Sequence, residues 1–295
     1  MTAPLLADAL GPRARRRVAF ASVGATAALL LVTFVALRRL AETGQLASAK
    51  WRPLAEPSTV RFLFGGLVNT LKVALLAMAL AVLVGGLMAL GRLARNRPLR
   101  WLSGIYVEFF RAVPLLLLIL FSALALPKYG LGLPAFGYLL LALVAYNSAV
   151  LGEIFRAGIL SLDRGQTEAA MAIGLGYWQS MLLVIIPQAV RRMVPAIVSQ
   201  LVTLLKDTSL GFVIGLSLRD RELLRRGRDL GEFYRNPLQS LVVVALIYIV
   251  INFALSRLAR RLEVRQRRRY SAGAISVAGI EDLAVVAAEA ESRVR

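Results

Sequence analysis

The residues best placed for chemistry are a carboxylate, two alanines and a glycine within residues 166–187. Glu168 is followed by Ala169 and Ala170, and Gly174 comes four positions after the second alanine. Alanine favours a helix, a carboxylate is stabilised near the positive end of a helix, and glycine permits a sharp turn. The pattern therefore predicts a short helix ended by glycine. We expect Glu168 both to cap this helix and to make a charge-assisted contact with another protein.

A helix this short does not persist alone in water, because helix nucleation is costly, so it needs a surface on which to dock. Asp163 precedes it as a candidate N-cap residue. Tyr177 and Trp178 follow the turn as two adjacent large rings. The alternative is a helix lying on lipid headgroups, with these aromatics at the membrane interface. The length of the pattern favours docking on a protein.

Catalytic chemistry is poorly supported elsewhere in the chain. Histidine and cysteine are absent, which removes the usual imidazole base, the thiol nucleophile and two common metal ligands. No carboxylate cluster has metal-ligand spacing, and no G-x-x-x-x-G-K-[ST] loop is present to hold a nucleotide. We therefore expect no catalytic residue, no metal site and no cofactor bound by this chain.

The composition is that of an all-α membrane protein. The chain has 295 residues, of which 58% are hydrophobic, and its formal net charge is +19. Several apolar runs approach the roughly 20 residues that cross a bilayer as a helix. Much of the arginine lies at the ends of those runs, as expected for cytoplasmic loops, and no nucleic-acid-binding motif is found. Membrane lipid, and not nucleic acid, is the expected partner.

Six spanning helices are predicted, with both termini in the cytoplasm. They cover residues 18–37, 62–90, 105–126, 135–156, 187–205 and 238–255. A cleaved signal peptide is the rival interpretation of the first run, but that run is longer than a typical signal core and has no clear cleavage site. The predicted organisation is a tail, an extra N-terminal helix and an outer loop at 1–61, a membrane domain at 62–262, and a cytoplasmic tail at 263–295.

Several connecting segments also carry predictions. Residues 41–61 and 219–237 are expected to be polar outer loops, although the arginines of the second loop conflict with the usual cytoplasmic bias. Residues 210–216 are apolar but too short to span, so we expect a partly inserted piece packed on the bundle. Pro114 can bend the third span. Gly85, Gly86 and Gly91 allow close helix packing in the second.

Polar side chains at membrane depth are candidates for a substrate pathway. They are Asn69, Glu108, Arg111, Asn147, Glu153, Arg191 and Gln200. The alternative for the charged groups is structural pairing of Glu108 with Arg111, and of Glu153 with Arg156, since residues three apart share a helix face. For Asn147 and Gln200, cavity lining and bonding between helices are equally open. An anionic substrate would suit Arg111 or Arg191.

These motifs together resemble the polar amino-acid uptake branch of ABC importer permeases. The resemblance covers about residues 62–262 and includes the E-A-A, three residues, G pattern, with an aliphatic run ending at Pro187. Further matching segments read NTLK at 69–72, YVEFFRAVPLL at 106–116, RAGILSLDRGQTEAA at 156–170, IPQAVRRMVP at 186–195 and LLKDTSL at 204–210. The extra N-terminal helix and long tail look most like actinobacterial glutamate permeases.

One segment departs from the family pattern. Where the family usually has R-G-T-P-L, this chain has RAVPL at 111–115. The glycine and the hydroxyl near the helix bend are thus replaced, which weakens any transfer of substrate contacts to this point.

The resemblance implies a type I importer fold in a bacterial cell membrane and a set of partners. Two permease subunits, identical or related, would form the pathway, and two ATP-binding subunits would use ATP and Mg. An extracytoplasmic binding protein would deliver the amino acid, with glutamate favoured. The coupling helix would seat in a groove on the ATPase through Glu168, Ala169, Ala170, Gly174, Tyr177 and Trp178. Its movement would switch the spans between outward and inward states.

Two other functions are weighed against this one. An ion-coupled carrier or channel often has repeated halves around a midplane site, which this sequence does not show, and such a protein has no use for the docking helix. A membrane-bound enzyme would need catalytic groups that the sequence lacks.

Overall fold

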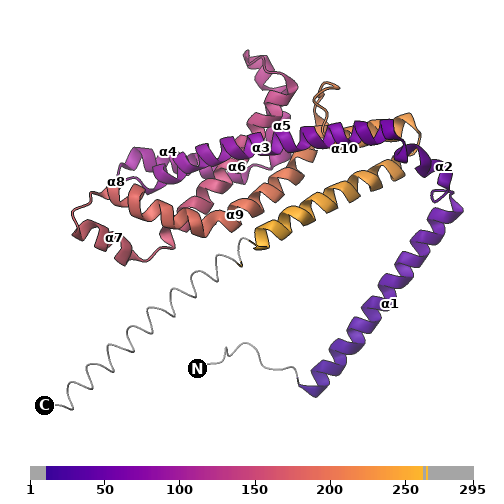
Figure 1. Ribbon diagram of the computed structural model, residues 1–295, viewed down its shortest axis with the longest axis horizontal. Helices are drawn as coiled ribbons and strands as arrows, with labels where there is room; N and C mark the ends of the chain where they lie inside the picture. The colour runs from indigo at the N-terminus through magenta and orange to yellow at the C-terminus, as the bar shows by residue number, and fades with distance from the viewer. Residues whose placement is uncertain (1–10, 262–263, 265–295) are drawn as a thin grey trace.

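The computed structural model describes residues 11–261 and residue 264. Residues 1–10 of the predicted N-terminal tail and nearly all of the tail predicted at 263–295 lie outside the described residues. Within the described part the regular structure is entirely helical (Figure 1).

The predicted spans correspond to helices of membrane-crossing length. Five described helices are long and apolar enough to cross a bilayer, or six if one bent pair counts as a span, so the all-α membrane fold is confirmed. The five are α1 (Pro12–Glu42), α3 (Pro57–Leu93), α6 (Ala135–Leu160), the helix Tyr177–Val213 and the helix Pro237–Arg261.

The third span is broken rather than gently bent. It consists of α4 (Arg97–Ala112) and α5 (Leu115–Leu124), whose axes differ by 99°. Pro114 lacks a backbone N–H and disfavours the helical conformation at the residue before it, and Val113 is extended. α5 therefore leaves the line of α4 and projects from the bundle, followed by the short helix η2 (Leu126–Tyr129) (Figure 1).

The fifth span begins at Tyr177 and not, as predicted, at Pro187. It runs through α8 (Tyr177–Ser180), the π-helical turn η3 (Met181–Ile185), α9 (Ile186–Asp207) and η4 (Thr208–Val213). In η3 the Ile186 N–H bonds to the carbonyl of Met181, which widens the helix just before Pro187. The proline, which has no N–H, is thus tolerated inside a longer helix.

Both segments predicted as polar outer loops contain helix. Residues 41–61 include α2 (Ser48–Trp51), η1 (Arg52–Ala55) and the start of α3. Residues 219–237 include α10 (Leu223–Phe233), whose N-terminus is capped by the buried Glu222 side chain. Capping and tertiary packing outweigh the polar composition at α10, since Leu223 and Leu230 are buried against the bundle.

The arginines of the α10 segment are held within that segment and against α3. Arg221 and Arg225 lie 2.6 and 3.4 Å from the carboxylate of Asp229. Arg226 donates to the carbonyl of Phe62 at 2.7 Å. Internal partners therefore account for much of the positive charge that conflicts with the expected cytoplasmic bias.

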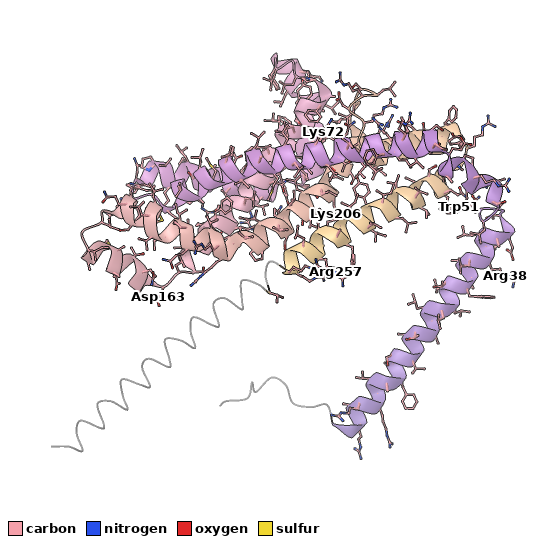
Figure 2. The ribbon with its side chains drawn as sticks, viewed as in Figure 1. Arg38, Trp51, Lys72, Asp163, Lys206 and Arg257 are labelled. Carbon is pink, nitrogen blue, oxygen red and sulfur yellow. The ribbon has the colours of Figure 1, made fainter. Side chains whose placement is uncertain are left out.

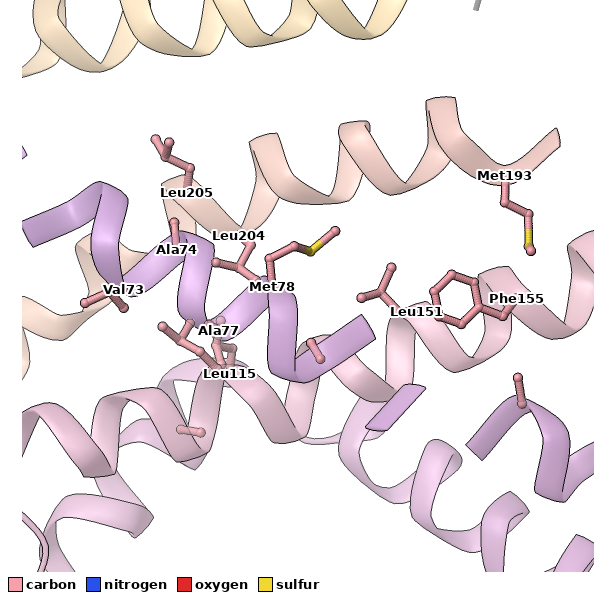
Figure 3. Close-up of a cluster of buried hydrophobic side chains, with 14 of the residues drawn as sticks. Val73, Ala74, Ala77, Met78, Leu115, Leu151, Phe155, Met193, Leu204 and Leu205 are labelled. Carbon is pink, nitrogen blue, oxygen red and sulfur yellow. The ribbon is translucent and has the colours of Figure 1, made fainter. Parts of the chain in front are cut away.

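The core lies between α3, α6 and α9, where apolar side chains interdigitate (Figure 3). α3 approaches α6 closely at Gly85, where an added Cβ would lie 2.7 Å from the carbonyl oxygen of Ser148. The predicted packing role of this glycine agrees with that geometry. The buried residues 214 and 216 pack on the same core, as expected for a partly inserted piece.

α1 lies apart from the core, and none of the residues in its most apolar stretch is buried. From its junction with α2, the α1 helix points away from the bundle (Figure 1). Two hydrogen bonds hold the segment that follows α1. Gln239 donates to the Gln45 carbonyl at 2.6 Å, and Asn236 donates to the Lys50 carbonyl at 2.8 Å.

Candidate functional site

The predicted short helix is α7 (Arg164–Ala172). The carboxylate of Asp163 accepts a hydrogen bond from the N–H of Gly165 at 2.8 Å, which caps the N-terminus as expected. Gly174 has φ +89°, and the Leu175 N–H bonds back to the Ala170 carbonyl at 3.2 Å. This left-handed glycine ends the helix in the manner that the sequence predicts.

Glu168 does not cap its own helix. Asp163 occupies the N-cap position of α7, and Glu168 lies beyond the first turn, which contains no acidic residue. Glu168 and Ala169 are exposed, whereas Ala170 is buried against the bundle. The Glu168 carboxylate is therefore available for a contact outside this chain.

Apolar side chains are exposed around the same helix. Ile173 is 78% exposed, Trp178 is 48% exposed and Met171 is 43% exposed. α7 lies at the end of the bundle remote from α2, and Asp163 and Trp51 mark the two ends (Figures 1 and 2). A carboxylate flanked by exposed apolar groups suits a protein docking surface. We call this set, Glu168, Met171, Ile173 and Trp178, the docking face.

Tyr177 faces the bundle and Trp178 faces outward. The Tyr177 hydroxyl donates to the carbonyl of Leu93 at 3.1 Å, and the Arg95 guanidinium lies 4.7 Å from the centre of the Tyr177 ring. The two aromatic rings meet edge to face at 5.4 Å. Tyr177 therefore joins the α7 region to the end of α3 and the loop before α4, a contact that the sequence did not reveal.

A second connection joins the α7 region to α9. Gln188 donates to the side-chain oxygen of Gln166 at 3.0 Å, and Arg192 donates to the carbonyl of Ser161 at 3.0 Å. With the Tyr177 contacts, these bonds fasten α7 to two spans. A displacement of α7 would therefore be transmitted to both.

Charged residues at this end of the bundle converge on Arg92. Its guanidinium lies 2.7 Å from the Glu153 carboxylate and 3.4 Å from that of Glu108. Arg156 pairs with Glu153 at 2.6 Å, as predicted, but Glu108 pairs with Arg92 and not with Arg111. Sequence spacing favoured the local partner, whereas the packing of α3 against α4 and α6 supplies a different one.

The sequence does not single out Arg92, because an arginine at the end of an apolar run is expected simply from the cytoplasmic bias of positive charge. It lies inside α3, seven residues after Gly85, and so on nearly the same helix face. At Gly85 the α3 helix approaches α6 so closely that an added Cβ would lie 2.7 Å from the Ser148 carbonyl oxygen. The small-residue pattern of α3 therefore contained a signal for the face on which Arg92 lies.

The amide candidates bond to protein groups instead of lining one common site. The Gln200 side chain donates to the side-chain oxygen of Asn147 at 2.8 Å, and Asn147 is fully buried. Asn69 donates to the carbonyls of Arg219 and Arg221 at 2.6 and 3.2 Å, beside α10. Between the two interpretations of Asn147 and Gln200, the structure favours bonding between helices.

The remaining pathway candidates are separate from those pairs. Arg111 is exposed on α4 beside the break at Pro114, and Arg191 is exposed on α9. The seven candidates therefore do not form one site. Glu108 and Glu153 belong to the ion pairs around Arg92, Asn147 bonds to Gln200, Asn69 lies beside α10, and Arg111 and Arg191 are exposed. Their roles in a pathway stay predictions.

Residues 81–268 match the family described as the binding-protein-dependent transport system inner membrane component. The chain belongs to this family. It is therefore a multi-pass ABC importer permease, and the family is the permease component of such transporters rather than their catalytic part.

Relatives of this permease extend the likeness over most of its length. The glutamate transport system permease protein GluD of Corynebacterium glutamicum is 41% identical over 78% of this chain and 84% of its own. The probable glutamine ABC transporter permease protein GlnP of Bacillus subtilis is 42% identical over 70% of this chain and 94% of its own.

Solved structures agree on the fold of the permease. The crystal structure of an amino acid ABC transporter with histidines superposes with a TM-score of 0.65 at 32% identity, covering 72% of this chain and 95% of that one. The MetNI methionine ABC transporter in an inward-facing conformation has a TM-score of 0.56 at 21% identity, covering 70% of this chain and 99% of that one, which shows the fold alone. The predicted type I importer fold is confirmed.

Proposed function

We propose that this permease carries a polar amino acid, with glutamate favoured, into the cell at the expense of ATP. Support comes from relatives named for glutamate and glutamine transport and from a similar structure of an amino acid transporter. In this proposal two separate ATP-binding subunits use ATP and Mg, and an extracytoplasmic binding protein delivers the substrate. A second permease subunit, identical or related, completes the pathway.

The observation that carries the proposal is the exposed docking face of α7. Ile173 and Trp178 offer apolar surface, and Glu168 offers a charge for a cation on the ATPase. Closure of the ATPase pair would move α7, and the bonds of Tyr177 and Gln188 would carry that movement into α3 and α9. In this proposal α7 and both termini lie in the cytoplasm.

For the substrate we propose Arg111 and Arg191 as candidate carboxylate contacts. Both are exposed cations, Arg111 on α4 and Arg191 on α9, and a guanidinium matches the geometry of a carboxylate. If either arginine binds substrate, Arg111→Ala or Arg191→Ala will raise the KM of uptake. Unchanged KM and unchanged substrate-stimulated ATPase activity in both variants would remove them from the pathway.

The test of the whole proposal is uptake of labelled glutamate by proteoliposomes that contain both permeases, the ATPase and the binding protein. We expect uptake that requires ATP and competition by unlabelled glutamate over other amino acids. Uptake that continues without any ATPase subunit would instead indicate an ion-coupled carrier or channel.

The docking face is tested by a double substitution, Glu168→Ala with Ile173→Asp. We expect the ATPase to be lost from the purified complex, since burial of Ile173 and the Glu168 contact are both removed. Glu232→Ala with Phe233→Asp is the matched control, because both residues are exposed at the end of α10. Equal ATPase recovery from the two double variants would exclude α7 as the coupling element.

A further inference from the structure

An open cleft of about 790 Å³ lies along α4 where it meets the ends of α3 and α6. Its wall carries four arginines, which are Arg92, Arg97, Arg100 and Arg156. Trp101, Gly104 and Ile105 of α4 add an apolar surface to the same cleft. The cleft contains no residue of the docking face, and Glu108 is the one pathway candidate on its wall.

The cleft has an excess of positive charge. Arg92 and Arg156 pair with two carboxylates, Glu153 and Glu108, the second of which is on the cleft wall. Arg97 and Arg100 are exposed, and among the described residues neither has a carboxylate within salt-bridge distance. Two cations at the mouth of the cleft are therefore left to attract an anion.

The position of the cleft points to a ligand with an apolar part. Arg97 and Arg100 lie at the start of α4, next to the end of α3, which is long and apolar enough to cross the bilayer. Trp101 is 68% exposed, as is common for tryptophan at a membrane interface. Beyond it, Ile105 is exposed, and no atom lies within 4 Å of the position that a Cβ on Gly104 would take.

We propose that this cleft binds an anionic phospholipid, with the headgroup phosphate at Arg97 and Arg100 and an acyl chain along α4 past Gly104. Basic pockets between spanning helices at the membrane surface suit such headgroups, and arginine matches phosphate geometry well. A soluble anion would use the arginines but would gain nothing from the exposed Trp101 and Ile105. The bound lipid would brace α4 beside the Arg92 ion pairs.

The charge requirement is tested with the full-length permease in phosphatidylcholine nanodiscs, with and without phosphatidylglycerol. The readout is the phosphatidylglycerol retained per protein after exchange into detergent, measured by native mass spectrometry. We expect the Arg97→Gln, Arg100→Gln double variant to retain about tenfold less than the wild type, because two phosphate contacts are removed. Arg16→Gln with Arg17→Gln removes the same charge from exposed positions on α1 and serves as the control.

The acyl-chain part is tested by Gly104→Leu, which fills the open space beside α4. Gly24→Leu on α1 is the matched control, because nothing lies within 4 Å of its Cβ position either. We expect Gly104→Leu to reduce retained phosphatidylglycerol severalfold while circular dichroism shows an unchanged helical content. Gly24→Leu is expected to retain the wild-type amount.

Three outcomes would overturn the lipid site. The first is retention in the double variant equal to that in the Arg16, Arg17 control. The second is equal retention of phosphatidylcholine and phosphatidylglycerol by the wild type. The third is full displacement of the lipid by millimolar inorganic phosphate, which would indicate a soluble anion as the ligand.

Discussion

Arg92 forms ion pairs with two carboxylates that come from different helices. It lies 18% exposed by side chain and contacts Glu108 of α4 and Glu153 of α6. A partly buried cation between two partners is costly to remove, because the carboxylates then keep their charge without full hydration. The residue therefore joins three helices at the α7 end of the bundle.

We predict that Arg92→Gln lowers the stability of the permease by about 1–3 kcal/mol. Thermal unfolding of the purified protein in detergent measures this change. Arg16→Gln, at an exposed position on α1, is expected to change stability by less than about 0.5 kcal/mol. If the two variants melt alike, the Arg92 pairs contribute nothing beyond those of an exposed surface charge.

Glu222 is a buried carboxyl that makes stability depend on pH. Burial raises the pKa of this group from its usual value of 4.5 to about 7, although the N–H groups of Leu224 and Arg225 that it caps act in the opposite direction. Between these two values the folded state holds a proton that the unfolded state has lost. Its contribution to stability is therefore complete below pH 4.5 and is lost as pH rises through about 7.

We predict that Glu222→Gln flattens the stability profile of the permease between pH 4.5 and about 7. The rise in the Glu222 pKa on folding corresponds to about 3 kcal/mol of stability that is lost between these two pH values. Melting temperatures of wild type and variant across this range measure it, with Glu232→Gln as an exposed control near the end of α10. A wild-type profile as flat as that of Glu222→Gln would show that Glu222 keeps its ordinary acidity.

At the scale of the element, α7 combines a fixed inner side with a free outer side. Asp163 caps the start of the helix, Gly174 ends it, and Ala170 is buried on its inner side. The neighbouring Tyr177 ties its far end to the Leu93 carbonyl. These anchors hold the docking face in one orientation, so that a partner meets a preformed surface.

We predict that Gly174→Ala weakens ATPase binding through backbone strain alone. Gly174 has φ +89° and open space around its Cβ position, so alanine would be strained without a clash, at a cost of about 1–2 kcal/mol. Gly176→Ala is the matched control, since Gly176 has φ −66° and only ordinary contacts. ATPase co-purification measures the effect, and equal recovery with both variants would contradict it.

At the scale of the whole molecule, α3 and α6 form the central pair on which the other helices pack. Their backbones meet at Gly85, where an added methyl group would overlap the Ser148 carbonyl. Ion pairs at one end of α3, and the contacts of α10 with Thr70 and Phe62 at the other, extend from this pair. A shift between α3 and α6 would therefore disturb both ends of the permease.

We predict that Gly85→Ala destabilises the permease by about 1–3 kcal/mol, because the two helices must move apart. Gly86→Ala is the control at the next position, where nothing lies within 4 Å of the Cβ, and it is expected to be neutral or slightly stabilising. Thermal unfolding compares the two. Equal melting temperatures would mean that α6 accommodates the added methyl group.

Local chemistry allowed much of this protein to be predicted from its sequence. Apolar runs of membrane length, the Asp163 cap and the glycine turn after α7 depend on residues close together in the chain. The short helix α7 and the membrane-length helices follow from such local properties, because hydrophobic length, capping and backbone freedom act over a few neighbouring residues.

Tertiary structure alone decided which distant groups meet. The 99° break between α4 and α5, the partners of Arg92 and the bond between Asn147 and Gln200 all depend on how separate helices pack. Sequence spacing paired Glu108 with Arg111, but the α3 helix brought Arg92 to it instead. The physical reason is that a charge or amide takes whichever partner the packed bundle places within reach, and sequence distance does not encode that position.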